Sequence, residues 1–239
     1  MRIVSLLIAP AFLLASCNFM GGQRVSGNGH ITTRDRQVGS FSRVDVSGDV
    51  AVHIRQDGGN SVRIETDENL MEYVDVYTNG NTVVIRTKQG YNLNPSKQLI
   101  AYVSAPSFEE IGVSGACDII GETPVTGSSP LSMHVSGDGD IKMEVDVPSV
   151  STDISGSGSV TLKGKAGTFN ADVSGSGDIK CFDLTTDNSK LDLSGDSDAE
   201  VTVNKQLDVT VSGSGDVRYR GAANVSQRVS GSGSVKKEG

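Results

Sequence analysis

The chain contains no tryptophan, few aromatic residues and a deficit of basic side chains. Aromatic residues make up 5% of its 239 residues, and 21 Lys and Arg stand against 29 Asp and Glu, for a net charge of −8. Aromatic side chains dominate the energetics of large cores, so their scarcity favours a thin, repeated aliphatic core. A protein that binds nucleic acid without sequence preference needs a basic surface to neutralise phosphates. We therefore expect no nucleic-acid partner.

The one long apolar run lies at the amino terminus and is too short to span a membrane. It extends from Ile3 to Leu14 and follows Arg2, whereas a membrane-spanning helix needs about 20 apolar residues. A charged start, a short apolar run and small residues before a cleavage point make up a secretory signal. We therefore expect residues 1–16 to be a signal peptide.

The signal ends in Leu14-Ala15-Ser16-Cys17, which resembles a bacterial lipobox. The resemblance implies cleavage before Cys17, a diacylglycerol on its sulfur, and a lipidated tether at residues 17–24 that binds the membrane. The alternative is an ordinary signal peptide with a chance cysteine. Asn18 stands where an Asp would resemble an inner-membrane retention signal, so the outer membrane is favoured. The sequence leaves open whether the protein faces the periplasm or the cell surface.

A short motif recurs along the chain: an aliphatic residue, Ser-Gly, two small residues and a second aliphatic residue. Its serines are Ser114, Ser136, Ser155, Ser174, Ser194, Ser212 and Ser230. Successive serines are separated by 22, 19, 19, 20, 18 and 18 residues. Earlier copies are Val25-Ser26-Gly27 and a shortened Val46-Ser47-Gly48. A period of this length is typical of stacked supersecondary units.

Aligning the copies on the serine gives two aliphatic columns, one just before the serine and one five residues after it. Flanking residues alternate between apolar and polar, as in a strand with one buried face. Stacking buries a continuous column that no single unit can bury. These features predict an all-β, parallel β-helix (solenoid) with Ser-Gly-x-Gly corners and rungs of 18–22 residues. It would be one domain at 25–239, irregular at 41–112 and regular at 113–239; an antiparallel sandwich is the alternative.

The irregular half contains several local signals. Asp57–Asn60 and Asn79–Asn81 have the composition of hairpin turns. Tyr91–Lys97 has the composition of a polar loop, and Glu68–Tyr73 is compatible with a short helical turn. The strand pairing of residues 41–112 stays open, between antiparallel pairing and rungs with long insertions.

Three segments resemble a bacterial family described as putative auto-transporter adhesin, head GIN domain. They are Phe41–Gly48, Asp67–Leu70 and Tyr102–Ile111, and the Ser-Gly copies follow them. The resemblance covers about residues 41–235. It implies a right-handed β-helix on exported lipoproteins of Gram-negative bacteria and an adhesive role, and it supplies no catalytic residues.

Tyrosines cluster in the irregular half, and Tyr73, Tyr77 and Tyr91 are the candidates for a binding face; Tyr102 lies in the same half. Loops on a rigid scaffold are where binding residues usually lie. The expected ligand is a glycan or a component of a host or envelope surface. The sequence is also compatible with a homo-oligomer.

A row of carboxylates follows the corner serines by four residues. The candidates for a cation ladder are Asp140, Asp178, Asp198 and Asp216. Hard cations prefer carboxylate oxygens, but each Asp is equally suited to capping its own turn. The histidines show no metal-ligand spacing; they are His30, His53 and His134. We expect no metal centre and no cofactor.

Two cysteines remain beyond the signal, Cys117 and Cys181, and they lie three repeats apart. Three steps of stacking correspond to about 14 Å, whereas a disulfide needs Cα atoms within about 7 Å. We expect no bridge between them.

No motif in the chain pairs a nucleophile with a base. The leading interpretation is a noncatalytic cell-envelope lipoprotein that acts as an adhesion or surface-binding module. One alternative is a polysaccharide-active enzyme of the β-helix type, which needs paired carboxylates at a defined separation. The other is a purely structural envelope protein.

Overall fold

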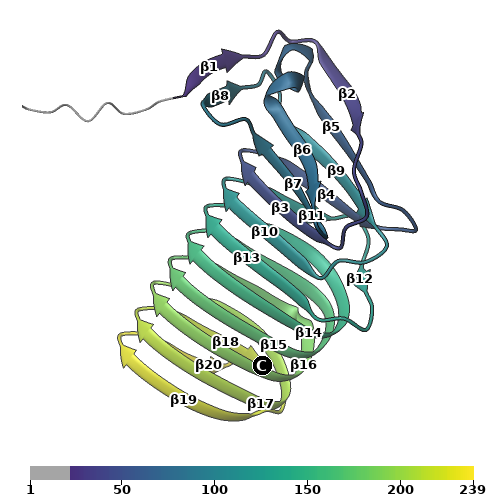
Figure 1. The fold of residues 1–239 in the computed structure, drawn as a ribbon. Coiled ribbons are helices and arrows are strands. Elements are labelled where there is room, and N and C mark those ends of the chain that lie inside the picture. Colours follow the sequence, from purple (N-terminus) through teal and green to yellow (C-terminus); the bar gives the residue numbers. More distant parts are fainter. Residues whose placement is uncertain (1–21) are drawn as a thin grey trace, which may run out of the picture.

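The computed structural model describes residues 22–239, and almost all of its elements are β-strands (Figure 1). The expected signal peptide and Cys17 lie outside the described residues. One short 3-10 helix, η1 (Glu68–Tyr73), confirms the predicted helical turn. No helix in the described part of the chain is long and apolar enough to cross a membrane.

Most strands form one stack in which successive rungs run parallel (Figure 1). These strands are β3 (Arg43–Gly48), β4 (Ala51–Gln56), β10 (Glu110–Gly115), β11 (Asp118–Gly121), β12 (Val125–Thr126), β13 (Leu131–Gly137), β14 (Ile141–Gly156), β15 (Ser159–Gly175), β16 (Asp178–Gly195), β17 (Ala199–Gly213), β18 (Asp216–Arg220), β19 (Asn224–Gly231) and β20 (Ser234–Lys237). The corner serines are register partners from Ser47 and Ser114 through to Ser230. The predicted solenoid is confirmed, with about seven turns. Its right hand stays a prediction.

The aliphatic columns run inside this stack. The residue before the corner serine is buried in every rung from Val113 to Val211, and the residue five after it from Ile119 to Val217. Each strand therefore turns one face inward, as the alternation predicts. The core is continuous along the stack because each rung covers the apolar face of its neighbour.

The packing around Phe169 shows how thin this core is. Phe169 is fully buried, and its register partners are Val150 and Ser189. Rungs lie only about 4.8 Å apart, so a large ring needs a small neighbour. The buried hydroxyl of Ser189 is 2.9 Å from that of Thr186, which also donates to the carbonyl oxygen of Thr202. The small polar neighbour is thus accommodated without an unpaired hydroxyl.

Stacking brings the backbone of neighbouring rungs close together at the Ser-Gly-x-Gly corners, although Cys117 and Ser197 replace the second glycine in two rungs. Gly156 has a φ of +139°, and a Cβ there would lie 2.2 Å from the carbonyl oxygen of Gly137 in the preceding rung. A Cβ at Gly158 would lie 2.1 Å from the carbonyl oxygen of Gly139. The amide of Ser157 donates to the carbonyl oxygen of Gly137 at 2.9 Å. Side chains at either glycine would obstruct this backbone contact.

A cap covers one end of the stack and consists of the segments before β3 and between β4 and β10 (Figure 1). The cap strands are β1 (Gln23–Ser26), β2 (Ile31–Arg36), β5 (Ser61–Asp67), β6 (Val74–Asn79), β7 (Thr82–Thr87), β8 (Tyr91–Asn94) and β9 (Ile100–Ala105). β6 and β7 pair antiparallel across Asn79–Asn81, which confirms that hairpin. β7 pairs in parallel with β3, and β9 with β4, so these two strands form a further rung with a long insertion between them. Insertions and antiparallel pairing therefore both occur, and each of the open alternatives is partly correct.

The turn at Asp57–Asn60 does not form the predicted hairpin. The strands that it joins, β4 and β5, are separated by β9, which pairs in parallel with β4 and antiparallel with β5. β5 pairs antiparallel with β2 on its other side. The order β2–β5–β9–β4–β11 therefore joins an antiparallel sheet to the parallel stack. The composition of a turn indicates where the chain reverses, but it does not indicate whether a later strand will lie between the two strands that the turn joins.

Two further expectations for the cap are wrong. The Val25-Ser26-Gly27 copy is not a rung, because its strand, β1, pairs with β8 in a separate two-stranded sheet. The segment Tyr91–Lys97 is not a loop throughout, because its first four residues form β8. The Ser-Gly dipeptide alone therefore does not specify a rung; the aliphatic columns on both sides of it do.

The buried carboxylate of Asp67 joins the segments around this small sheet. Its Oδ1 accepts hydrogen bonds from the amide of Gly29 at 2.7 Å and from the hydroxyl of Ser96 at 2.6 Å, and its Oδ2 accepts from the amide of Ser96 at 2.8 Å. Burial raises the pKa of Asp67, but the hydrogen bonds from Ser96 and Gly29 outweigh it and hold the pKa below its usual range. Asn69 adds bonds to Asn28 and Ser26.

Both cysteines in the described part of the chain are free and buried. Cys117 takes the place of the second corner glycine in its rung, and its thiol donates to the carbonyl oxygen of Gly48 at 3.3 Å. Cys181 faces the core from β16, opposite Val201 of the next rung. Burial raises the pKa of Cys117 to about 11 and that of Cys181 to about 12.

Candidate functional site

A hollow of about 510 Å³ lies on the outer face of the sheet where the cap joins the stack. Its polar and aromatic lining residues are Asp35, His53, Arg55, Asp57, Ser61, Arg63, Tyr102, Ser104 and Glu122. We call this hollow the polar groove. Its residues lie on β2, β4, β5 and β9 and directly after β4 and β11. The groove therefore forms where the cap strands meet the first rungs of the stack.

Strand register places the lining residues in rows across the groove. Arg63 of β5 lies opposite Asp35 of β2 on one side and Tyr102 of β9 on the other. Tyr102 in turn lies opposite His53 of β4, with the two ring centres 5.3 Å apart. A neighbouring row holds Ser61, Ser104 and Arg55. The outward side chains of four strands therefore meet over one surface.

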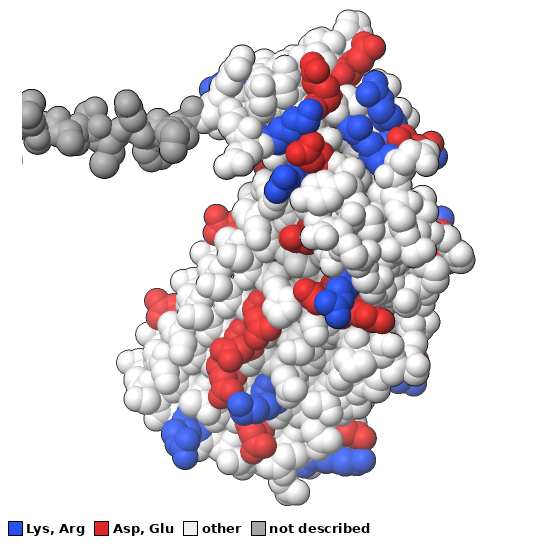
Figure 2. Space-filling model, viewed as in Figure 1, with Lys and Arg blue, Asp and Glu red and all other residues white. Residues whose placement is uncertain are grey.

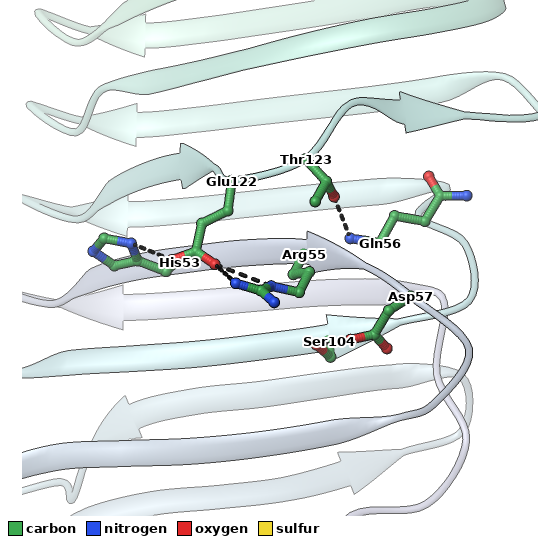
Figure 3. A network of polar contacts seen from close by, with 7 residues as sticks. All are labelled: His53, Arg55, Gln56, Asp57, Ser104, Glu122 and Thr123. Atoms are coloured by element: carbon green, nitrogen blue, oxygen red, sulfur yellow. Dashed lines mark hydrogen bonds and ion pairs between the residues drawn. The ribbon is translucent and has the colours of Figure 1, made fainter.

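Glu122 forms the centre of the polar contacts in Figure 3. Its Oε2 accepts hydrogen bonds from Nε and Nη2 of Arg55 at 3.1 and 2.8 Å, and its Oε1 lies 3.1 Å from Nδ1 of His53. The hydrogen bonds from Arg55, and secondarily from His53, lower the pKa of Glu122 although burial opposes them. The same contact raises the pKa of Arg55. Both groups are held in their charged forms.

The other carboxylates of the groove are also paired. Arg63 Nε donates to Oδ1 of Asp35 at 2.8 Å. Asp57 accepts from the amide of Gly59 at 3.1 Å and from the hydroxyl of Ser104 at 2.9 Å (Figure 3). These two hydrogen bonds, first that from Gly59, lower the pKa of Asp57.

Gln56 fixes one side of the groove to the stack. Its amide donates to the hydroxyl of Thr123 at 2.9 Å (Figure 3). Its side-chain nitrogen donates to the carbonyl oxygens of Pro106 and Thr126 at 3.0 and 2.9 Å, and its side-chain oxygen accepts from the amide of Thr126 at 2.8 Å. The side chain thus uses both of its polar ends, which gives the groove a fixed border.

Glu122 and Asp57 lack one property of a glycosidase acid. A glycosidase needs a carboxylic acid whose pKa is raised so that it can protonate the leaving group. The pKa values of Glu122 and Asp57 are instead lowered. In the described part of the chain, no group of three or more His, Cys, Asp or Glu side chains could hold a metal ion. The paired donors and acceptors are suited to a polar ligand.

The three tyrosines proposed as a binding face do not share one contact. The rings of Tyr73 and Tyr91 lie 4.6 Å apart, beside the sheet of β1 and β8. Tyr77 is 38% exposed, and its ring faces the guanidinium of Arg86 at 5.5 Å. Tyr102 lies in the polar groove. The aromatic residues therefore mark different parts of the cap.

The aspartates of the candidate cation ladder bond to the next rung along the stack. Oδ1 of Asp140 accepts from the amide and the hydroxyl of Ser159, each at 2.8 Å, and Oδ1 of Asp198 accepts from the amide of Asp216 at 2.8 Å. Asp178 and Asp216 make corresponding bonds to Asp198 and Ser234. These hydrogen bonds join neighbouring rungs instead of capping each aspartate's own turn, and the cation ladder stays a prediction.

A stripe of acidic residues crosses the front of the stack in Figure 2. Asp153, Asp172 and Asp192 are register partners on β14, β15 and β16. His134 lies at the end of this row, with Nδ1 2.9 Å from Asp153. The His134 side chain is half-exposed on the stack, whereas only about a quarter of the His53 side chain is exposed, within the groove.

Sequence reasoning missed most of the groove: His53, Arg55, Arg63 and Glu122 were not singled out as a site. A signal was present in the alternation of His53-x-Arg55, which marks two outward-facing residues of one strand. This signal was insufficient because the two residues have partners far away in the sequence: His53 lies beside Tyr102, and Arg55 bonds to Glu122.

The family model described as "Putative auto-transporter adhesin, head GIN domain" matches residues 40–223. No curated protein matches the chain.

Several crystal structures have a similar fold. A putative adhesin from Bacteroides fragilis matches with a TM-score of 0.85 and 21% identity, over 90% of this chain and 100% of that chain. A putative lipid binding protein from Parabacteroides distasonis matches with a TM-score of 0.71 and 22% identity, over 91% of this chain and 100% of that chain. A putative adhesin from the same species matches with a TM-score of 0.70 and 24% identity, over 90% of this chain and 100% of that chain. Identities this low show the fold alone.

Proposed function

The chain belongs to the putative auto-transporter adhesin, head GIN domain family, and from this membership we propose that it is a noncatalytic binding module of the bacterial cell envelope. The polar groove is its contact surface. The observation that carries the proposal is the pairing in this groove, where arginines, hydroxyls and backbone amides hold the carboxylates, and the pKa values of Glu122 and Asp57 are lowered. Such groups can exchange hydrogen bonds with a ligand but are not poised to transfer a proton.

Attachment to the envelope is the second part of the proposal. The lipobox-like Leu14-Ala15-Ser16-Cys17 supports a lipid anchor at Cys17, and Asn18 favours the outer membrane. Asp67 and Asn69 hold residues 26–29 against the cap, so the chain runs from the anchor into a fixed part of the fold. A stiff stack held in this way suits weak, repeated contacts with a surface.

An attachment assay tests this function. Beads carrying the full-length chain are applied to an array of glycans and extracellular-matrix proteins, and retained beads are counted. We expect retention on at least one surface and a loss of about tenfold or more with Arg55→Ala/Arg63→Ala, which removes two groove cations, since truncating a hot-spot residue costs about tenfold or more.

The matched control is Lys163→Ala/Lys205→Ala. These lysines are also exposed and form ion pairs of 2.9 Å with Glu144 and Asp187 on the stack. The control removes the same charge and the same number of surface ion pairs, which contribute little to stability. Equal retention by both double variants, or no retention by the unmodified chain on any surface, would contradict the proposal.

A further inference from the structure

The middle of the polar groove contains a platform that is part aromatic and part aliphatic. Tyr102 is half-buried and lies between Arg63 and His53 in the cross-strand row. Ile120, which lies opposite His53 in the same row but beyond the residues that line the groove, is 40% exposed. Adjacent strands are about 4.8 Å apart. The row therefore offers a strip of ring and alkyl surface with polar groups at its side.

Donors and acceptors alternate around this platform. The guanidinium groups of Arg55 and Arg63 can only donate, whereas the carboxylates of Glu122 and Asp35 can only accept. Each guanidinium contacts one of these carboxylates, at 2.8 Å in both pairs. A hydroxyl group can donate and accept at once. A ligand with neighbouring hydroxyls can therefore bond to both members of such a pair, which a ligand with only donors or only acceptors cannot do.

The charge balance of the groove also restricts the ligand. Its carboxylates, Asp35, Asp57 and Glu122, face the cations Arg55 and Arg63, with His53 beside them. An anionic ligand would find no excess positive charge. A cationic ligand would find two carboxylates neutralised by arginines and only Asp57 outside an ion pair, with its carboxylate already bonded to Gly59 and Ser104. The hollow of about 510 Å³ lies within the usual size range of small-ligand sites.

We infer that the polar groove binds a neutral glycan, with one sugar ring against Tyr102 and its hydroxyls bonded to the Arg63–Asp35 and Arg55–Glu122 pairs. A pyranose has an apolar C–H face and a rim of hydroxyls, which match the platform and the alternating pairs. This inference rests on the proposed binding function and specifies its ligand class.

Affinity electrophoresis of the full-length chain in detergent tests the inference. The gels contain laminarin, galactomannan or starch as neutral chains, alginate or heparin as acidic chains, or gelatin as a peptide ligand. We expect at least one neutral chain to retard the protein. Tyr102→Ala and Arg63→Gln should each weaken that binding about tenfold or more, since hot-spot side chains in binding sites have effects of this size. Arg63→Gln replaces an exposed guanidinium with a neutral amide, so it keeps the test valid if Tyr102→Ala fails to fold.

Tyr219→Ala is the matched control, because Tyr219 is half-buried like Tyr102 but lies on β18 of the stack, outside the groove. It should change the apparent Kd less than twofold. Binding of acidic chains or gelatin alone, or neutral-chain binding that survives both groove variants, would overturn the inference. If no neutral chain binds while beads are still retained on matrix proteins, the glycan inference fails and the proposed binding function stands. If the beads are not retained either, both fail.

Discussion

At the residue scale, the corner glycines combine two constraints that are separable in most proteins. Gly156 has a positive φ, and its missing Cβ also leaves room for the carbonyl oxygen of Gly137 in the rung before it. A turn glycine at an exposed loop meets only the first constraint. The corner of each rung is therefore shaped by the neighbouring rung as well as by its own chain reversal.

Gly156→Ala should lower the free energy of unfolding by about 3 kcal/mol, because it adds backbone strain and a steric overlap. Urea unfolding followed by circular dichroism measures this change. Gly58→Ala is the control, since a Cβ at Gly58 meets no atom within 4 Å; it should stay within about 0.5 kcal/mol of the unmodified protein. Equal effects at the two positions would show that stacking does not constrain the corner.

The two buried thiols should be unreactive in the folded protein. Burial raises their pKa values to about 11 and about 12, and the thiolate is the reactive form. Because the pKa values of the folded protein are raised, the two protonated thiols contribute to the stability of the fold. This contribution is complete below about pH 8.5, the usual pKa of a thiol. It is lost as pH rises through 11 and 12.

Mass spectrometry after iodoacetamide treatment at pH 8 tests this expectation. Cys117 and Cys181 should remain unlabelled in the native chain, and both should be labelled in urea. Rapid native labelling of either thiol would contradict its burial. A crosslinked peptide containing both cysteines would contradict the stacking order itself.

At the scale of elements, the small sheet of β1 and β8 depends on one buried side chain more than on its own strands. A two-stranded sheet is marginally stable by itself. Asp67 bonds to the segments that follow β1 and β8, through Gly29 and Ser96. This accounts for the Asp67–Leu70 segment of the family resemblance: its polar residues hold the start of the described chain against the cap.

Asp67→Ala should release this sheet while leaving the stack intact. Loss of hydrogen bonds to a charged group should lower stability by about 2 kcal/mol at neutral pH. Because the pKa of Asp67 is lowered in the folded state, the carboxylate's contribution is present above pH 4 and is lost as pH falls further. Hydrogen-exchange mass spectrometry should show faster exchange in residues 23–29 and 91–96 and unchanged exchange in β15. Uniform acceleration in all strands would contradict a local role.

The regular rungs could be predicted from sequence because each repeats the same constraint. The columns from Val113 to Val211 and from Ile119 to Val217 mark a buried face seen from many copies. The cap has no such redundancy. The Asp57–Asn60 turn indicated that β4 and β5 are neighbours, but β9 enters between them. The sequence therefore identified Tyr102, in β9, as an aromatic residue of the cap, but it did not predict that Arg63 and His53 lie on either side of it in the groove.

At the scale of the whole molecule, the account requires an anchor at one end of the chain and a binding surface on the fold. Cys17 lies outside the described residues, so its lipidation is tested in cells. Cys17→Ser should move the protein from the membrane fraction to the soluble periplasmic or extracellular fraction, because anchoring depends on burying acyl methylenes. Immunoblots of fractionated cells measure this shift. An unchanged membrane fraction would contradict the lipid anchor.

The central claim is that the protein binds without turning over its ligand, and one measurement tests it most directly. The full-length chain is incubated with a polysaccharide panel, and the release of reducing ends and of unsaturated sugars is followed over time. Glu122 and Asp57, whose pKa values are lowered, lack the raised pKa of a general acid, so we expect no release above the protein-free blank. Release that is abolished by Glu122→Gln would contradict the claim and identify an enzyme.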